Sequence, residues 1–320
     1  MENKVMPKIR IASVQAEMVF LELERCTEKC VSLIREAGEH GCDLIVFPES
    51  YLPGYPDWWE FYRLGAEGRM FDRELFLNSI SLESPYMAQI CDACREASIN
   101  AVLGINETEP GVIGTMYNTH VYIGRDGHIA GKHQKYVPTV GERLTQAPGT
   151  TGYANSFETD FGVVSSLICG ENSNPLGLYA AATRYPVVHA ASWPSHFGLD
   201  MDMHRINRMA TASAAYMLKA FVVNSVTRIS GEYIERMSHQ QQIRDFLTAE
   251  KARMMGATVM DPFGRIVACG DGDPSDLLMC EVDLKDVIVP HVFQDFAGHY
   301  QRPELFAPLF ERKPQADGRS

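Results

Sequence analysis

The chain has 320 residues, of which 45% are hydrophobic and 22% are charged, as in an ordinary soluble protein with a large core. Its 41 Asp and Glu residues outnumber its 29 Lys and Arg residues, and the resulting formal net charge of −12 argues against nucleic acid or an anionic membrane as the main partner. No apolar run reaches the length of a membrane span and the first residues lack the apolar region of a signal peptide, so the expected location is the cytoplasm.

The first half of the chain alternates between strand and helix patterns. Alternating or continuous apolar runs predict strands at 8–16, 42–48, 99–105 and 117–124. Apolar residues at helical spacing predict helices over 21–38 and 85–97, the second with Ser84 as N-cap and Pro85 as its first residue. The RDG turn at 125–127 predicts that HIAGKH pairs with the strand before it in a hairpin.

The second half continues the alternation. Strands are predicted at 161–169, 185–194, 221–226 and 277–284, helices at about 176–184 and 201–220, and a hairpin at 257–269. No repeat or flexible linker interrupts the series, which indicates one domain over 1–320 with a core at about 8–285. The C-terminal segment at 286–310 is expected to lie at a subunit interface, and 311–320 is expected to be a frayed polar tail. The expected class is layered α/β, with hairpins extending a helix-covered sheet.

The eight cysteines do not suggest a disulfide framework, because the chain is long and carries no export signal. The CDAC run at 91–94 resembles a redox or metal pair. However, Cys91 and Cys94 lie on the apolar stripe of one predicted helix, and Cys26 and Cys30 lie on that of another, which favours core packing. There is no second CxxC, no HExxH and no nucleotide-binding glycine motif, so neither a metal nor another cofactor is expected.

Three reactive side chains follow predicted strands, at the positions where α/β sheets place their sites. Glu49 follows CDLIVFP, Lys135 follows the hairpin strand and Cys169 follows FGVVSSLI. A thiol is a poor nucleophile until it loses its proton, and a buried carboxylate can accept that proton. A lysine ammonium stabilises negative charge that develops on a substrate. Together the three types suffice for covalent attack on a carbon–nitrogen bond without a metal.

Three segments resemble the active-site signatures of the nitrilase, or carbon–nitrogen hydrolase, superfamily. They are FPES at 47–50 with the YLPGYPDWW that follows, KHQKYVPTVGERL at 132–144 and LICGEN at 167–172, in the family's order and with comparable gaps. VVHAASWP at 187–194 and DFAGHYQRPELF at 295–306 are similar to segments of the true nitrilase branch. The resemblance extends over roughly residues 8–310 and implies a four-layer α-β-β-α sandwich.

The resemblance also implies roles for individual residues. Carried over by position, Glu49 is the general base, Lys135 the charge stabiliser and Cys169 the nucleophile, and Glu142 matches a second glutamate that supports them. The expected substrate contacts are Tyr55, Gly170, Glu171 and Trp193, within an aromatic pocket to which Tyr51, Trp58 and Trp59 also point. One position departs from the pattern, because nitrilases usually carry Trp directly after the nucleophile and this chain has Gly170. A glycine there removes a bulky wall and leaves nitrile-versus-amide preference open.

The implied reaction is hydrolysis of an organic nitrile to its carboxylic acid and ammonia through thioimidate and thioester intermediates on Cys169. An amidase or carbamoylase of the same superfamily would use identical residues. A non-catalytic binding protein on this fold and a redox protein built on CDAC are further readings that the residues favour less. The resemblance implies a homodimer, or a larger spiral homo-oligomer, acting on a small-molecule nitrile or amide.

Overall fold

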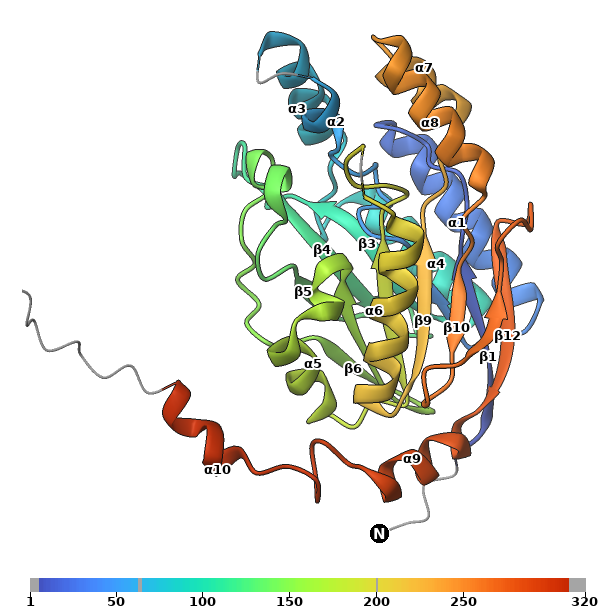
Figure 1. The fold of residues 1–320 in the computed structure, drawn as a ribbon. Coiled ribbons are helices and arrows are strands. Elements are labelled where there is room, and N and C mark those ends of the chain that lie inside the picture. Colours follow the sequence, from blue (N-terminus) through green and yellow to red (C-terminus); the bar gives the residue numbers. More distant parts are fainter. Residues whose placement is uncertain (1–5, 63–64, 200, 311–320) are drawn as a thin grey trace, which may run out of the picture.

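The computed structural model describes residues 6–62, 65–199 and 201–310, and its strands form two six-stranded sheets (Figure 1). In the first sheet β1, β2 and β3 run parallel and the other neighbours pair antiparallel. Its strand order is β12 (Leu277–Asp283), β1 (Lys8–Val14), β2 (Leu44–Val46), β3 (Asn100–Glu107), β4 (Tyr117–Ile123) and β5 (Ile129–Gln134).

The second sheet repeats this plan. Its strands β7, β8 and β9 are parallel, and antiparallel strands extend the sheet on both sides. Its order is β11 (Ile266–Cys269), β10 (Thr258–Met260), β9 (Phe221–Val226), β8 (Val188–Trp193), β7 (Gly162–Ile168) and β6 (Ser156–Thr159). The hairpins predicted at 117–133 and 257–269 are therefore confirmed, and each extends a core of parallel strands.

Helices cover the outer face of each sheet. Helices α1 (Leu23–Glu39) and α4 (Pro85–Ala97) pack on the first sheet, and α5 (Pro175–Ala182) and α6 (Met203–Leu218) pack on the second. A third apolar cluster fills the space between the two sheets and contains residues of β1, β2 and β3 from one side and of β7, β8 and β9 from the other. The layer order is α-β-β-α, which confirms the predicted four-layer sandwich.

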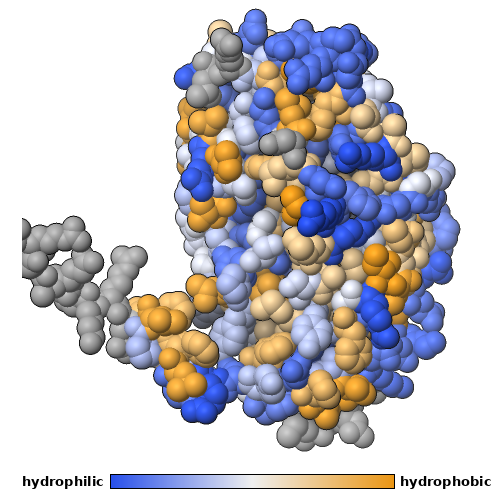
Figure 2. All heavy atoms as spheres, in the orientation of Figure 1, coloured by the Kyte–Doolittle hydropathy of each residue, from blue (hydrophilic) through white to orange (hydrophobic). Residues whose placement is uncertain are grey.

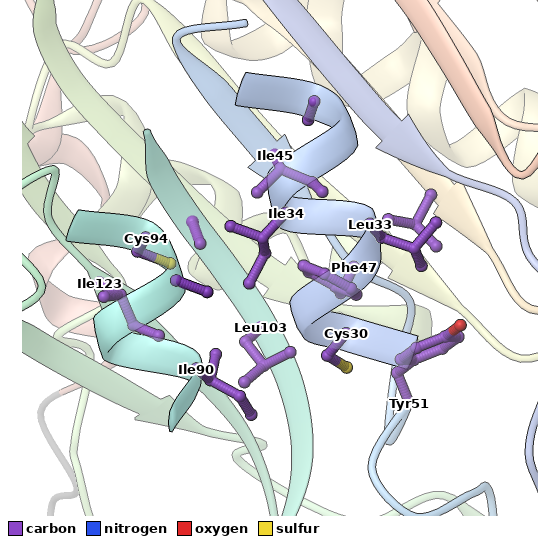
Figure 3. Packing of buried hydrophobic residues seen from close by; sticks show 14 of the residues in the cluster. Cys30, Leu33, Ile34, Ile45, Phe47, Tyr51, Ile90, Cys94, Leu103 and Ile123 are labelled. Atoms are coloured by element: carbon purple, nitrogen blue, oxygen red, sulfur yellow. The ribbon is translucent and has the colours of Figure 1, made fainter. Parts of the chain in front are cut away.

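The packing of α1 and α4 shows why their cysteines repeat at helical spacing. Cys30, on α1, and Cys94, on α4, point into the cluster that these helices form with Ile45 and Leu103 of the first sheet and with Phe47, directly after β2 (Figure 3). Helix α4 begins as predicted, because the Ser84 side chain accepts a hydrogen bond from the Met87 N–H and a proline follows the cap. Core packing is thus confirmed for Cys26, Cys30 and Cys94, whereas Cys91 is half-buried at the rim of the cluster.

Four helices that the periodicity did not predict lie at the top of Figure 1. They are α2 (Trp58–Phe61), α3 (Ala66–Asn78), α7 (Gly231–Met237) and α8 (Gln241–Arg253). Their apolar residues form one cluster with Phe20, whose ring contacts Trp58, Phe71 and Tyr233. Short β6 was also not predicted, because its four residues carry too little pattern.

The C-terminal segment leaves the body of the molecule. After the 3-10 turn at Leu284–Val287 come α9 (Ile288–Phe293), α10 (Pro303–Phe306) and a 3-10 turn at Ala307–Leu309, which run outward along the lower edge of the view (Figure 1). The Tyr216 hydroxyl donates to Gln294 at 2.7 Å and ties the start of this segment to α6. All of residues 302–310 are exposed. The predicted frayed tail at 311–320 lies outside the described residues.

Candidate active site

Glu49 lies in the turn after β2 and is completely buried. Its Oε1 accepts a hydrogen bond from the Asn118 side chain at 2.7 Å, while its Oε2 has no partner among the described residues. The turn can lie this close to β3 because residue 104 is a glycine. A Cβ at Gly104 would lie 2.0 Å from the carbonyl oxygen of Pro48. The backbone of the turn therefore packs directly against β3. Glu49 Oε2 remains free to accept a proton.

Lys135 follows β5 directly and brings a buried ammonium to this carboxylate. Its Nζ donates to Glu49 Oε1 at 2.7 Å and to both oxygens of Glu142, at 2.9 and 2.8 Å. The side chain is 1% exposed. Because an ammonium has three hydrogens, these three bonds fully satisfy it and fix its position.

Glu142 belongs to the 3-10 turn Val140–Leu144 and is also completely buried. The Thr139 N–H donates to its Oε2 at 2.8 Å, and the Tyr55 hydroxyl donates to its Oε1 at 2.5 Å. Tyr55 is itself almost fully buried. Glu142 thus joins the lysine to the aromatic loop that follows Glu49, and Tyr55 acts on the site through this carboxylate.

Cys169 is the residue at which β7 ends and the 3-10 turn Cys169–Ser173 begins. Its φ is +50°, in the left-handed region that a residue with a side chain seldom adopts. The residue is 5% exposed, and it belongs to a cluster that includes Trp193 and Met203. Backbone strain of this kind persists where the surrounding structure fixes a functional side chain.

The charges of this cluster shift the protonation of each member. Burial raises the pKa of Glu49 to about 7, which the neighbouring Lys135 opposes and Glu142 reinforces. Burial also disfavours the charge of Lys135, but Glu49 and Glu142 outweigh that effect and the pKa of the ammonium is raised. Burial raises the pKa of the Cys169 thiol well above its ordinary value, and Lys135 offsets part of the rise. The resting site therefore holds a neutral thiol beside a carboxylate that can accept its proton near neutral pH.

The remaining predicted contacts fall into two groups. Gly170 is exposed, and a Cβ built there meets no atom within 4 Å, so open space takes the place of the expected tryptophan. Trp193 ends β8 with its Nε1 buried and unpartnered among the described residues. Glu171 is buried, and its carboxylate accepts hydrogen bonds from Ile168, Tyr136 and His133.

The aromatic residues that follow Glu49 lie partly in the hydrophobic core and partly beside the candidate site. Tyr51 packs on Phe47 beneath the first sheet, and Trp58 lies in the cluster around Phe20. Trp59 lies against Gly141, immediately before Glu142, where an added Cβ would overlap its ring. Trp59 therefore contacts the turn that carries Glu142.

Several residues of the candidate site are not predicted from the sequence. Asn118, on β4, donates to Glu49, and Gly104 admits the Glu49 turn. Nothing in a single sequence marks either residue, since their roles depend on which strands become neighbours. His133 is a residue that the sequence does mark. It lies two residues before Lys135, and side chains two residues apart along a strand lie on the same face of the sheet.

Within the described ranges, no group of three or more His, Cys, Asp or Glu side chains has an arrangement that could hold a metal ion. In the same part of the chain, none of the helices has the length and apolar character needed to cross a membrane.

The family model described as carbon–nitrogen hydrolase matches residues 10–289. An aliphatic nitrilase of Sinorhizobium fredii (strain HH103) is 30% identical over 318 residues, which cover 97% of this chain and 98% of the relative. A nitrilase from an unknown prokaryotic organism, Nitrilase 2, is 29% identical over 93% of this chain and 91% of its own length. A cyanide hydratase of Botryotinia fuckeliana (strain T4) is 31% identical over 96% of this chain and 83% of its own length.

Solved structures share the fold at lower sequence identity. A carbon–nitrogen hydrolase from Helicobacter pylori G27 superposes with a TM-score of 0.72 at 15% identity and covers 96% of this chain and 99% of its own. Saccharomyces cerevisiae Nit3, a member of branch 10 of the nitrilase superfamily, superposes with a TM-score of 0.66 at 18% identity, covering 97% of this chain and 96% of its own.

Proposed function

Since the chain belongs to the carbon–nitrogen hydrolase family and is a nitrilase-type hydrolase of carbon–nitrogen bonds, we propose that it converts an organic nitrile to its carboxylic acid and ammonia, with Cys169 as the nucleophile. The observation that carries this proposal is the free Oε2 of buried Glu49, which lies in one cluster with the Lys135 ammonium and the Cys169 thiol. Relatives named nitrilase and aliphatic nitrilase along almost the whole chain support the choice of a nitrile.

In the first half of the reaction, the Cys169 thiol transfers its proton to Glu49 as the sulfur attacks the nitrile carbon. The carbon–nitrogen triple bond becomes a double bond, and its electron pair passes to nitrogen. Lys135 stabilises the charge that develops there, and the proton held by Glu49 completes a neutral thioimidate. A pKa near 7 suits Glu49 to accept this proton and return it.

In the second half, Glu49 removes a proton from a water molecule as its oxygen adds to the thioimidate carbon. Collapse of the tetrahedral intermediate expels the nitrogen as ammonia and leaves a thioester. A second water releases the carboxylic acid and restores the thiol, so that one nitrile and two waters give one acid and one ammonia. The Glu142 carboxylate takes no proton in this scheme and holds Lys135 in place.

An amide substrate is the second candidate, and the open space beside Gly170 favours its consideration. With an amide, attack by the thiol would give the tetrahedral intermediate directly, without a thioimidate. Ammonia would leave from that first tetrahedral intermediate. The thiol, base and lysine would keep their roles. In either case Gly170 and Trp193 are the residues that we propose to line the pocket, and the partner is a small molecule.

The experiment is a panel of aromatic, arylaliphatic and aliphatic nitriles, cyanide included, each organic nitrile paired with its own amide. Ammonia and the carboxylic acid are quantified for every pair. The proposal predicts that at least one nitrile yields acid and ammonia in equal amounts, faster than the matched amide. Amides that turn over while every nitrile stays intact would make the protein an amidase, and ammonia from neither class would contradict both candidates.

A further inference from the structure

The two reactive halves of the proposed site come from different sheets. Lys135 extends from β5 at one edge of the first sheet, and Cys169 extends from β7 of the second. Among the described residues, the strand ladders form two separate sheets, and none of these ladders joins β5 to β7. The distance between the lysine and the thiol therefore depends on side-chain contacts that cross from one sheet to the other.

Glu171 makes such a contact with both oxygens of its carboxylate. Oε2 accepts from the Ile168 N–H at 2.9 Å, and Ile168 is the residue directly before the nucleophile. Oε1 accepts from the Tyr136 N–H at 2.6 Å, and Tyr136 is the residue directly after the lysine. One buried carboxylate thus holds the backbone next to Cys169 and the backbone next to Lys135 at the same time.

His133 completes the arrangement from β5. Its Nε2 lies 2.9 Å from Glu171 Oε2, and both side chains are buried. The other ring nitrogen of His133, Nδ1, has no partner among the described residues, so the contact with Glu171 is the hydrogen bond that orients the ring. The ring of Tyr136 lies edge-on to it, with centroids 4.8 Å apart.

The neighbouring residue Asn172 provides a comparison within the same turn. Its side chain donates to the carbonyl oxygens of Leu167 and Cys169, and its Oδ1 lies 3.0 Å from Nε2 of His189 on β8. All of these partners belong to the second sheet or to its turn. Asn172 therefore shapes the turn that carries the nucleophile, whereas Glu171 relates that turn to the lysine.

We propose that Glu171 and His133 are positioning residues, which hold the Cys169 turn at the correct distance from Lys135 and Glu49 through the hydrogen bonds of one shared carboxylate. This inference rests on the proposed function, because it takes Cys169 as the nucleophile. A misplacement of about 1 Å between reacting groups can slow a reaction about a hundredfold, so loss of this brace should slow the chemistry more than it weakens substrate binding.

The test compares His133→Phe, which keeps an aromatic ring but removes the donor, with His133→Gln, which returns a side-chain N–H near the position of Nε2. Glu171→Gln is the third variant. For each, kcat and KM are measured on a nitrile that the wild type hydrolyses, with kcat expressed per reactive Cys169 thiol. We expect His133→Phe and Glu171→Gln to lose at least about tenfold in kcat with KM within about threefold, and His133→Gln to recover most of the loss.

A second readout needs no substrate and separates this inference from the proposed function. Methyl methanethiosulfonate modifies thiols, and mass spectrometry of the peptide that contains Cys169 gives the rate at each pH. The rate–pH profile of Cys169 should shift in His133→Phe and return in His133→Gln, while that of exposed Cys269 stays unchanged as an internal control. If the wild type released no ammonia from any substrate, the proposed function would fail while this readout still tested the brace.

Two outcomes would overturn the inference. The first is a kcat per reactive thiol within about twofold of the wild type, and an unshifted profile, in both His133→Phe and Glu171→Gln. The second is failure of both variants to fold, because the brace would then be a determinant of folding rather than of position.

Discussion

Glu49 is a residue whose surroundings define its chemistry. One oxygen is held by Asn118 and Lys135, and the other is free. Burial, reinforced by Glu142, raises its pKa to about 7 even though an ammonium lies beside it. A carboxylate with an ordinary pKa would be a weaker base toward a thiol whose own pKa is raised by burial.

The pH dependence of activity follows from this pKa. In the proposed mechanism Glu49 accepts the thiol proton only when it is ionised, so kcat/KM for a nitrile should rise with pH and level off above about 7. Below that value it should fall about tenfold for each pH unit. The measurement is kcat/KM between about pH 5.5 and 8.5, with circular dichroism recorded at each pH to establish that the protein stays folded. A flat profile across pH 7 would contradict the assignment of Glu49 as the base.

At the residue scale, the sequence predicted those members of the site that lie in contiguous motifs. Glu49, Lys135, Glu142 and Cys169 each follow a strand or stand in a turn with reactive chemistry, and the structure brings the first three into direct contact. Glu171 is expected to contact the substrate, and in the structure its carboxylate also accepts hydrogen bonds from residues 35 and 38 positions away, at and just after β5. Such contacts depend on how the two sheets stack, and the local pattern of apolar and polar residues does not determine that stacking.

The elements that carry the site are fixed by close approaches between backbones. The turn that presents Glu49 passes so near β3 that only a residue without a Cβ fits at position 104. This contact determines where the strand end, and with it the base, comes to lie relative to Lys135.

Gly104→Ala tests that dependence. The added methyl group would meet the Pro48 carbonyl oxygen at 2.0 Å, and the turn must move to relieve the overlap. We expect kcat to fall at least about tenfold, together with a lower melting temperature. Gly131→Ala on β5 is the matched control, since its methyl group would meet only a side-chain carbon of Tyr122 at an ordinary 3.5 Å. Retention of full kcat in Gly104→Ala would show that the position of the base does not depend on this contact.

At the element scale, prediction succeeded where one face is buried over many residues. Helix α4 matches its predicted bounds because the cap, the proline and the apolar stripe agree, and β9 matches because a continuous apolar run defines it. Helices α2, α3, α7 and α8 were not predicted. Helix α8 buries only Ile243 and Leu247 of its 13 residues, and α2 has only four residues, so neither carries a periodic signal above its surroundings.

For the whole molecule, the C-terminal segment suggests that the single chain is not the complete assembly. Figure 2 shows apolar side chains on the projecting arm, where Leu305, Phe306, Leu309 and Phe310 are each more than half exposed. We propose that these side chains are covered by a second copy of the chain, in a homodimer or a larger spiral. Exposed apolar residues gathered on an extended segment are typical of an interface.

The oligomer proposal predicts a mass of at least two chains by size-exclusion chromatography with light scattering. Replacing Phe306 and Leu309 together by Asp should shift the mass toward a single chain, because two carboxylates would be buried without partners. Ile113→Asp, at an exposed apolar residue in the loop between β3 and β4, is the control and should leave the mass unchanged. A wild-type protein with the mass of one chain would contradict the proposal.

The predicted layered α/β class was sufficient to anticipate the helix-covered sheets, and the resemblance to the nitrilase superfamily supplied the four-layer order that the structure confirms. Periodicity alone could not supply that order, since apolar strands buried on both faces look alike in either sheet. The path of residues 286–310 was equally beyond reach, because an arm that leaves the body has no local pattern to mark its direction.

The central claim is that Cys169 performs the chemistry, and the most direct test is ammonia release by Cys169→Ala. Cys280→Ala, at a half-buried cysteine on β12, serves as the control, and circular dichroism and melting temperature establish that both variants fold. The account predicts that Cys169→Ala loses at least about a thousandfold in ammonia release from a nitrile substrate while Cys280→Ala keeps the wild-type rate. Turnover by folded Cys169→Ala at the wild-type rate would contradict it.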